Sequence, residues 1–86
     1  MREIRSPTIY DYDLPATYLI CVRGKIKAGW SDRLGGMAIS LEVRPDGAFE
    51  TTLLGELRDQ AAVLGVLNTL YELHVALLSV SRLSGD

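Results

Sequence analysis

The side chains most often used for proton transfer and nucleophilic attack are scarce in this chain. His74 is the sole histidine and Cys21 the sole cysteine among 86 residues. His74 follows an apolar helical pattern, where a left-handed residue commonly ends a helix, so a helix-ending or exposed role is favoured over catalysis. Cys21 is flanked by apolar Ile20 and Val22, which favours a structural thiol, buried or at an interface, over a nucleophile. A single cysteine allows neither an intrachain disulfide nor a multi-cysteine metal site.

The carboxylates are scattered along the predicted loops and strand exteriors. They lack the spacing of a calcium loop or of a paired acid and base: Asp11, Asp13, Asp32, Asp46, Glu50 and Glu56. The glycines of AGWSDRLGG (28–36) do not follow the spacing of a dinucleotide or phosphate-binding loop. We therefore predict no catalytic, cofactor-binding or metal-ligating residues, and no cofactor.

Length, composition and charge indicate an ordinary globular domain. Eighty-six residues make one domain with a modest core, and the hydrophobic (48%) and charged (23%) fractions are those of a folded protein. Nine basic and eleven acidic residues give a net charge of −2 without a basic block, which argues against nucleic acid as a partner. The chain begins without an apolar targeting segment and holds no run of about 18 apolar residues, so we expect no membrane association and a cytoplasmic location.

An amphipathic helix from Asp59 to Leu73 organises the rest of the chain. Asp59 has the short acceptor side chain of a helix N-cap. Apolar residues follow at steps of three and four, which puts one stripe against a core: Ala62, Val63, Val66, Leu67, Leu70 and Leu73. Gly65 costs about 1 kcal/mol in a helix interior, and we expect it to mark close approach of the sheet backbone.

Four strands are predicted from alternation of apolar and polar residues. Residues 17–27, 37–44 and 49–57 precede the helix, and Leu78 and Val80 alternate with serines after it. The predicted core faces are Tyr18, Ile20, Val22 and Ile26, then Met37, Ile39, Leu41 and Val43, then Thr51, Leu53 and Leu57. Gly24 and Gly55 are candidate bulges. Pro45-Asp46-Gly47 has the residue types of a hairpin turn.

The connector at residues 28–36 holds the lone Trp30. Ser31 is placed to cap a single helical turn through residue 34, which Gly35 and Gly36 would end. A large aromatic residue on a glycine-rich loop either anchors a ligand or partner, or closes the end of a small core. We favour the second interpretation.

The predicted fold class is α+β. A β-β-β-α-β order with a right-handed final crossover gives a ferredoxin-like sheet of order 4-1-3-2, with one long helix on one face and the first helix reduced to a loop. The domain spans residues 17–84. Residues 1–16 are read as an extended arm, whose Tyr10 and Tyr12 either pair at a sheet edge or with a partner subunit, or belong to a frayed terminus.

One helix covers only one face of a sheet, so the other face needs a cover. The opposite face mixes Leu19, Cys21 and Leu54 with charged residues, a pattern that predicts a homodimer or an arm-covered sheet. The residues we predict to contact an interface or a ligand are Tyr10, Tyr12, Leu19, Cys21, Trp30, Leu54, Leu64 and Tyr71.

Three segments resemble a widespread group of small bacterial proteins of unknown function. They are Trp30-Ser31-Asp32 after the first strand, TTLLG at residues 51–55, and DQAAVLGVL at residues 59–67, followed by LLSV. The similarity covers roughly residues 18–83. Leu64 stands where this group frequently has His, and His74 where Gly commonly ends the helix. The resemblance implies a compact α/β fold and no particular activity.

Three functions fit these features. The favoured one is a non-catalytic homodimeric module that binds a partner protein. The alternative is a small-molecule-sensing dimer whose ligand binds near Trp30 and Cys21. A minimal enzyme acting on an apolar substrate between sheet and helix is the least favoured, because a single helix over a thin core leaves little room for a cavity.

Overall fold

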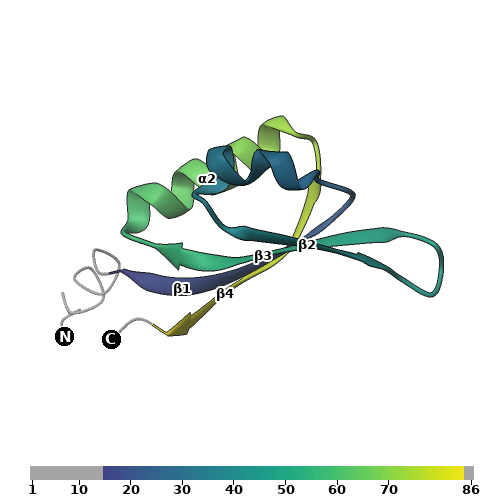
Figure 1. Ribbon diagram of the computed structural model, residues 1–86, viewed down its shortest axis with the longest axis horizontal. Helices are drawn as coiled ribbons and strands as arrows, with labels where there is room; N and C mark the ends of the chain where they lie inside the picture. The colour runs from purple at the N-terminus through teal and green to yellow at the C-terminus, as the bar shows by residue number, and fades with distance from the viewer. Residues whose placement is uncertain (1–14, 85–86) are drawn as a thin grey trace, which may run out of the picture.

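The computed structural model describes residues 15–84. The chain forms β1 (Ala16–Arg23), the 3₁₀ helix η1 (Ala28–Leu34), β2 (Ala38–Val43), β3 (Phe49–Leu57), α2 (Gln60–Glu72) and β4 (Ala76–Ser84) (Figure 1). The four predicted strands and the long helix are present in the predicted order. β1 begins at Ala16, which is buried and lies opposite Leu57.

The strands form one antiparallel sheet of order β2-β3-β1-β4. This is the predicted order 4-1-3-2 read from the other edge. Because β1 is antiparallel to both of its neighbours, β3 and β4 run in the same direction on either side of it. The protein is thus a small α+β domain with the long helix on one face of the sheet, which we call the inner face.

Alternation along the strands builds the core on the inner face. Tyr18, Ile20 and Val22 of β1 are buried, and Ile20 lies opposite Leu53 of β3 and Val80 of β4. The predicted core faces of β1 and β3 are confirmed. The buried apolar residues are Ala16, Tyr18, Ile20, Val22, Ile26, Leu34, Met37, Leu53, Leu57, Val66 and Leu70.

Helix α2 has the predicted ends. The Asp59 carboxylate accepts a hydrogen bond from the Ala62 backbone N–H at 2.8 Å, which satisfies one donor of the first turn. Val66 and Leu70 face the core. At the other end His74 adopts a φ of 61°, the left-handed conformation expected of the residue that ends the helix.

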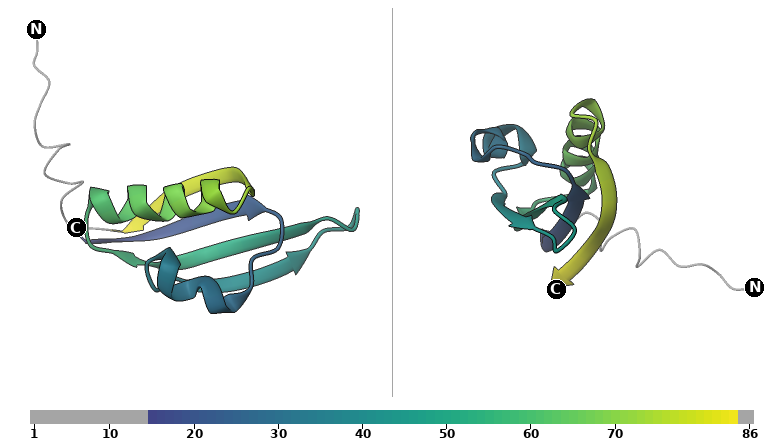
Figure 2. Two further views of the ribbon diagram at one scale, coloured as in Figure 1. Left: turned by 90° about the horizontal axis from the view of Figure 1, so that it is seen from above. Right: turned by 90° about the vertical axis from the view of Figure 1, so that its right-hand side faces the viewer.

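The connector predicted as a loop is a 3₁₀ helix, so that prediction was wrong. η1 runs over residues 28–34 and buries Leu34 completely. Ser31 does not cap it, because its hydroxyl donates to the Met37 carbonyl at 2.8 Å. Gly35, at φ 69°, ends η1 in the left-handed conformation. η1 and α2 lie side by side over the inner face, with η1 toward β2 (Figure 2).

A buried hydroxyl holds the chain where it leaves β1. The Thr51 Oγ1 donates to the Gly24 carbonyl at 2.6 Å and accepts from the Ile26 N–H at 3.2 Å. Gly24, at φ 125°, turns the chain away from the sheet toward η1. It therefore marks a bend that follows β1, and the ladder between β1 and β3 is regular up to that point.

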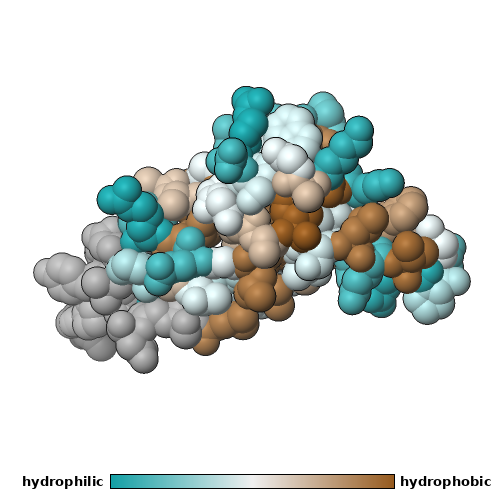
Figure 3. Space-filling model, viewed as in Figure 1, coloured by the Kyte–Doolittle hydropathy of each residue, from teal (hydrophilic) through white to brown (hydrophobic). Residues whose placement is uncertain are grey.

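The β2–β3 hairpin extends beyond the two helices (Figure 1). Asp46 accepts a hydrogen bond from the Ala48 N–H at 2.9 Å and Gly47 has a positive φ, as the predicted turn requires. Leu41 and Val43, predicted as core, are 42% and 65% exposed, because neither η1 nor α2 reaches this end of the inner face. Apolar surface is visible at this end of the molecule in Figure 3.

The structure does not bear out the predictions for Gly55 and Gly65, nor the regular alternation of Leu78 and Val80 in β4. Gly55 is not a bulge, because both ladders of β3 run through it without a shift; a Cβ there would lie 3.1 Å from the Met37 Cα. Gly65 approaches no other backbone, since a Cβ there would meet nothing within 4 Å. In β4 a register shift pairs Leu77 with Val22 and Val80 with Ile20, so Leu78 has no partner in β1.

Candidate interaction surface

The predicted contact residues fall on separate parts of the molecule. Leu19, Cys21 and Leu54 lie on the outer face of the sheet, away from the helices. Trp30 belongs to η1, and Leu64 and Tyr71 belong to α2. Tyr10 and Tyr12 lie outside the described residues. The structure therefore puts Leu19, Cys21 and Leu54 on one surface. It puts Leu64 and Tyr71 on another.

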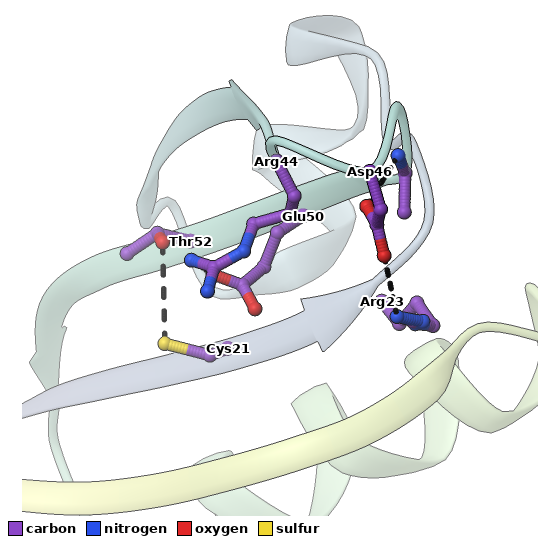
Figure 4. Close-up of polar contacts among 7 residues, drawn as sticks. Cys21, Arg23, Arg44, Asp46, Glu50 and Thr52 are labelled. Atoms are coloured by element: carbon purple, nitrogen blue, oxygen red, sulfur yellow. Dashed lines mark hydrogen bonds and ion pairs between the residues drawn. The ribbon is translucent and has the colours of Figure 1, made fainter.

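The outer face is mostly polar. Leu54, 44% exposed, lies opposite Leu19 and Ala38, and the Cys21 sulfur lies 3.9 Å from the Thr52 hydroxyl (Figure 4). Toward the hairpin two ion pairs border this row, Arg44 with Glu50 at 3.3 Å and Arg23 with Asp46 at 3.9 Å. Exposed pairs of this kind add little stability. Among the residues of β1, β2 and β3, Leu54 is the one large apolar side chain on this face that is strongly exposed.

Trp30 packs against the core, as the favoured interpretation predicted. Its ring is half-buried, and the Arg33 guanidinium lies 5.2 Å from the ring centre. Beside it is a shallow hollow of about 230 Å³ that also contacts Lys25, Lys27 and Leu73. Cys21 lies on the opposite face of the sheet, so one pocket of a single copy cannot contain both Cys21 and Trp30.

The largest group of exposed apolar side chains lies along α2 and β4. We call it the α2–β4 surface. Within residues 15–84 it comprises six of the ten strongly exposed large apolar residues: Leu64 (57%), Tyr71 (78%), Leu77 (51%), Leu78 (49%), Val80 (40%) and Leu83 (55%). Scattered apolar residues are normal on a protein surface, but a contiguous group marks an interaction site. Four of these six residues line hollows shared by α2 and β4: Leu64, Tyr71, Leu77 and Val80.

Two open hollows join the helix to the strand within this surface. One, of about 340 Å³, lies between Val63 and Leu64 of α2 and Val80 of β4, with Tyr18 also in its lining. The other, of about 260 Å³, lies between Leu67 and Tyr71 of α2 and Leu77 of β4. Leu64 and Tyr71, seven residues apart on one flank of the helix, thus belong to a single surface with β4.

Strand β4 is an edge of the sheet. No strand among residues 15–84 pairs with its outer side. It is nine residues long, ALLSVSRLS, with Arg82 as its one charged residue. The predicted strand order already put this strand at an edge, but sequence reasoning did not single out its exposed apolar residues. The strand lacks the Lys, Glu and Pro that normally protect an exposed edge.

The described residues offer little else for chemistry. Within residues 15–84 no group of three His, Cys, Asp or Glu side chains is placed to hold a metal ion. In the same part of the chain no helix is both long and apolar enough to cross a membrane.

A family model described as Domain of unknown function (DUF8691) matches residues 17–81. The chain belongs to this family. The match covers β1 through most of β4, so the DUF8691 domain includes the α2–β4 surface except Leu83. Among curated proteins and among solved structures no match was found.

Proposed function

We propose that this protein is a non-catalytic interaction module that works as a homodimer. The observation that carries the proposal is the α2–β4 surface, because a domain of this size gains stability by covering apolar area that its own chain leaves exposed. Leu54 on the outer face and Leu41 and Val43 at the hairpin add smaller apolar areas. A further protein partner would bind to whichever of these areas the dimer leaves free.

The same proposal includes the fold type and the setting. The strand order and the helix following β3 support a ferredoxin-like domain in which η1 replaces the first helix. The resemblance to small bacterial proteins supports a bacterial source, and the proposed setting is the cytoplasm.

Sedimentation equilibrium tests the proposal directly. We expect a dimer at micromolar protein concentration, with dissociation on dilution. A protein that stays monomeric throughout the micromolar range would contradict self-association, whatever surface is involved.

The alternative function is a small-molecule sensor. The hollow beside Trp30 supports it, because two lysines beside an aromatic ring suit an acidic ligand with a flat apolar part. We expect such a ligand to raise the melting temperature by several degrees, and Trp30→Leu to remove that shift. A broad panel of acidic metabolites without any shift would count against the sensor.

A further inference from the structure

We propose that β4 pairs antiparallel with β4 of a second copy around a two-fold axis, so that two four-stranded sheets join into one. This inference rests on the proposed self-association and specifies its geometry. Its starting point is backbone chemistry: an edge strand carries a row of N–H and C=O groups that a further strand can pair with. An apolar surface alone would leave the orientation of the partner open, whereas a strand edge fixes it.

The two edges of the sheet differ in how open they are to such pairing. β2 is six residues long and β4 is nine, and each holds one charged residue, Glu42 and Arg82, so β4 has the longer uncharged run, residues 76–81, and apolar side chains on its flank. Charged residues and short length are the usual protection of an edge. β4 is the less protected edge, and the α2–β4 surface lies directly beside it.

A second copy suits this edge better than the chain's own first residues. Thr17 lies opposite Ser84, so the chain enters β1 beside the last residues of β4. Residues 1–14, if laid along the outer side of β4, would have to run parallel to it. Parallel pairing is slightly less stable per residue, and antiparallel pairs are roughly two to three times more common. Two identical strands related by a two-fold axis perpendicular to the sheet pair antiparallel by symmetry.

The register of β4 indicates where the axis passes. Register shifts against β1 leave residues 79–82 as the regular part of the strand. Residues that lie opposite one another in an antiparallel pair point to the same face. An axis at Val80 therefore puts the two Val80 side chains together on the inner face, and Ser79 opposite Ser81 of the second copy on the outer face. The half-exposed Val80 and Leu77 become buried on both copies.

The apolar area of the α2–β4 surface is more than half of the area that each partner of a stable dimer buries. Six side chains that are about half exposed provide on the order of 500 Å² of apolar area per copy, and each partner of a standard interface buries roughly 800 Å². The β4 backbone and the polar residues beside it would provide the remainder. The charge distribution is compatible, since a Val80-centred register keeps the two Arg82 side chains from lying directly opposite each other.

Opposite charges at the axis test this geometry. In Val80→Lys and in Val80→Glu, two like charges meet at the two-fold axis, and each variant alone should raise the dimer dissociation constant about 100-fold or more. An equimolar mixture should recover association, because the introduced ammonium of one variant then lies opposite the introduced carboxylate of the other. Recovery also shows that both variants are folded. Sedimentation equilibrium gives all three constants.

Two matched variants locate the interface. Val43→Lys changes an inner-face valine of the other edge strand, and Leu54→Lys changes the exposed leucine of the outer face; both should leave the dimer intact. If Val80→Lys dimerises like the wild type, if the mixture stays monomeric, or if Leu54→Lys is the variant that dissociates, the β4 pairing is wrong. A wild-type protein that is itself monomeric would instead refute the proposed function.

Discussion

The two edges of the inner face show how far a short chain can cover its own sheet. Beside β2, η1 packs next to α2, and Met37 and Leu34 are fully buried. On the β4 side, no second helix among the described residues packs next to α2. Leu77 and Val80, on the same face of the sheet, are 51% and 40% exposed. The difference comes from a single seven-residue 3₁₀ helix on one side of α2.

This contrast predicts that substitutions on the two sides of α2 have different effects. The closed side buries apolar residues within the chain, and substitutions there should change the free energy of unfolding. The open side leaves similar residues half exposed, and substitutions there should change association with little effect on folding. Leu34 on the closed side and Leu64 on the open side allow a direct comparison.

Removal of the side chain that anchors η1 should have the largest effect. Leu34 is completely buried, and Leu→Ala at such a site typically costs about 2–5 kcal/mol through lost burial and a residual cavity. Because small domains are stable by only about 5–15 kcal/mol, we expect Leu34→Ala to lower the urea midpoint severely. Urea unfolding followed by circular dichroism gives the change.

The matched control is Leu64→Ala on the open side, where the leucine is 57% exposed. Both substitutions are measured in the Val80→Lys background, so that association does not add to the apparent stability. We expect Leu64→Ala to cost less than about 1 kcal/mol. Equal losses at the two leucines would mean that the open side is buried within a single copy.

The buried hydroxyl at the bend after β1 should have the next largest effect. Thr51→Val keeps the shape of the side chain but leaves the Gly24 carbonyl and the Ile26 N–H without their partner. An unsatisfied buried group costs about 1–3 kcal/mol, and we expect a loss in that range. Thr52→Val on the outer face is the control, because its 3.9 Å contact with the Cys21 sulfur is weak; it should change the free energy of unfolding by less than about 0.5 kcal/mol.

The sequence was sufficient for the elements whose signals are local. Asp59 as N-cap, His74 as the left-handed residue after α2, and the Asp46-Gly47 turn all depend on a few neighbouring residues, and all three were predicted correctly. The strand order followed from the handedness of the last crossover, which is a general rule of chain geometry.

Other features depend on the extent of the helical layer, which periodicity does not reveal. Leu41 and Val43 alternate like core residues, but the hairpin extends past the helices and leaves them exposed. η1 was missed because its two terminal glycines argued against a helix, whereas a 3₁₀ segment needs only a few residues and buries Leu34. The sequence also did not show how much β4 contributes to the α2–β4 surface. The one-residue register shift that leaves Leu78 without a partner arises from pairing with β1, which alternation along β4 does not reveal.

The smallest effect should be a gain of stability within α2. Gly65 lies in the helix interior and is exposed, and an added Cβ would meet no atom within 4 Å. Ala is favoured over Gly in a helix by about 1 kcal/mol, so Gly65→Ala in the Val80→Lys background should raise the melting temperature by roughly 4–8 °C. Differential scanning calorimetry measures the shift. A fall in melting temperature would mean that another part of the same chain approaches α2 at Gly65. Because Gly65 lies nearly opposite Leu67 around the helix, away from β4, the same substitution in the wild-type background should leave the dimer dissociation constant unchanged, and an increase would contradict the β4 pairing.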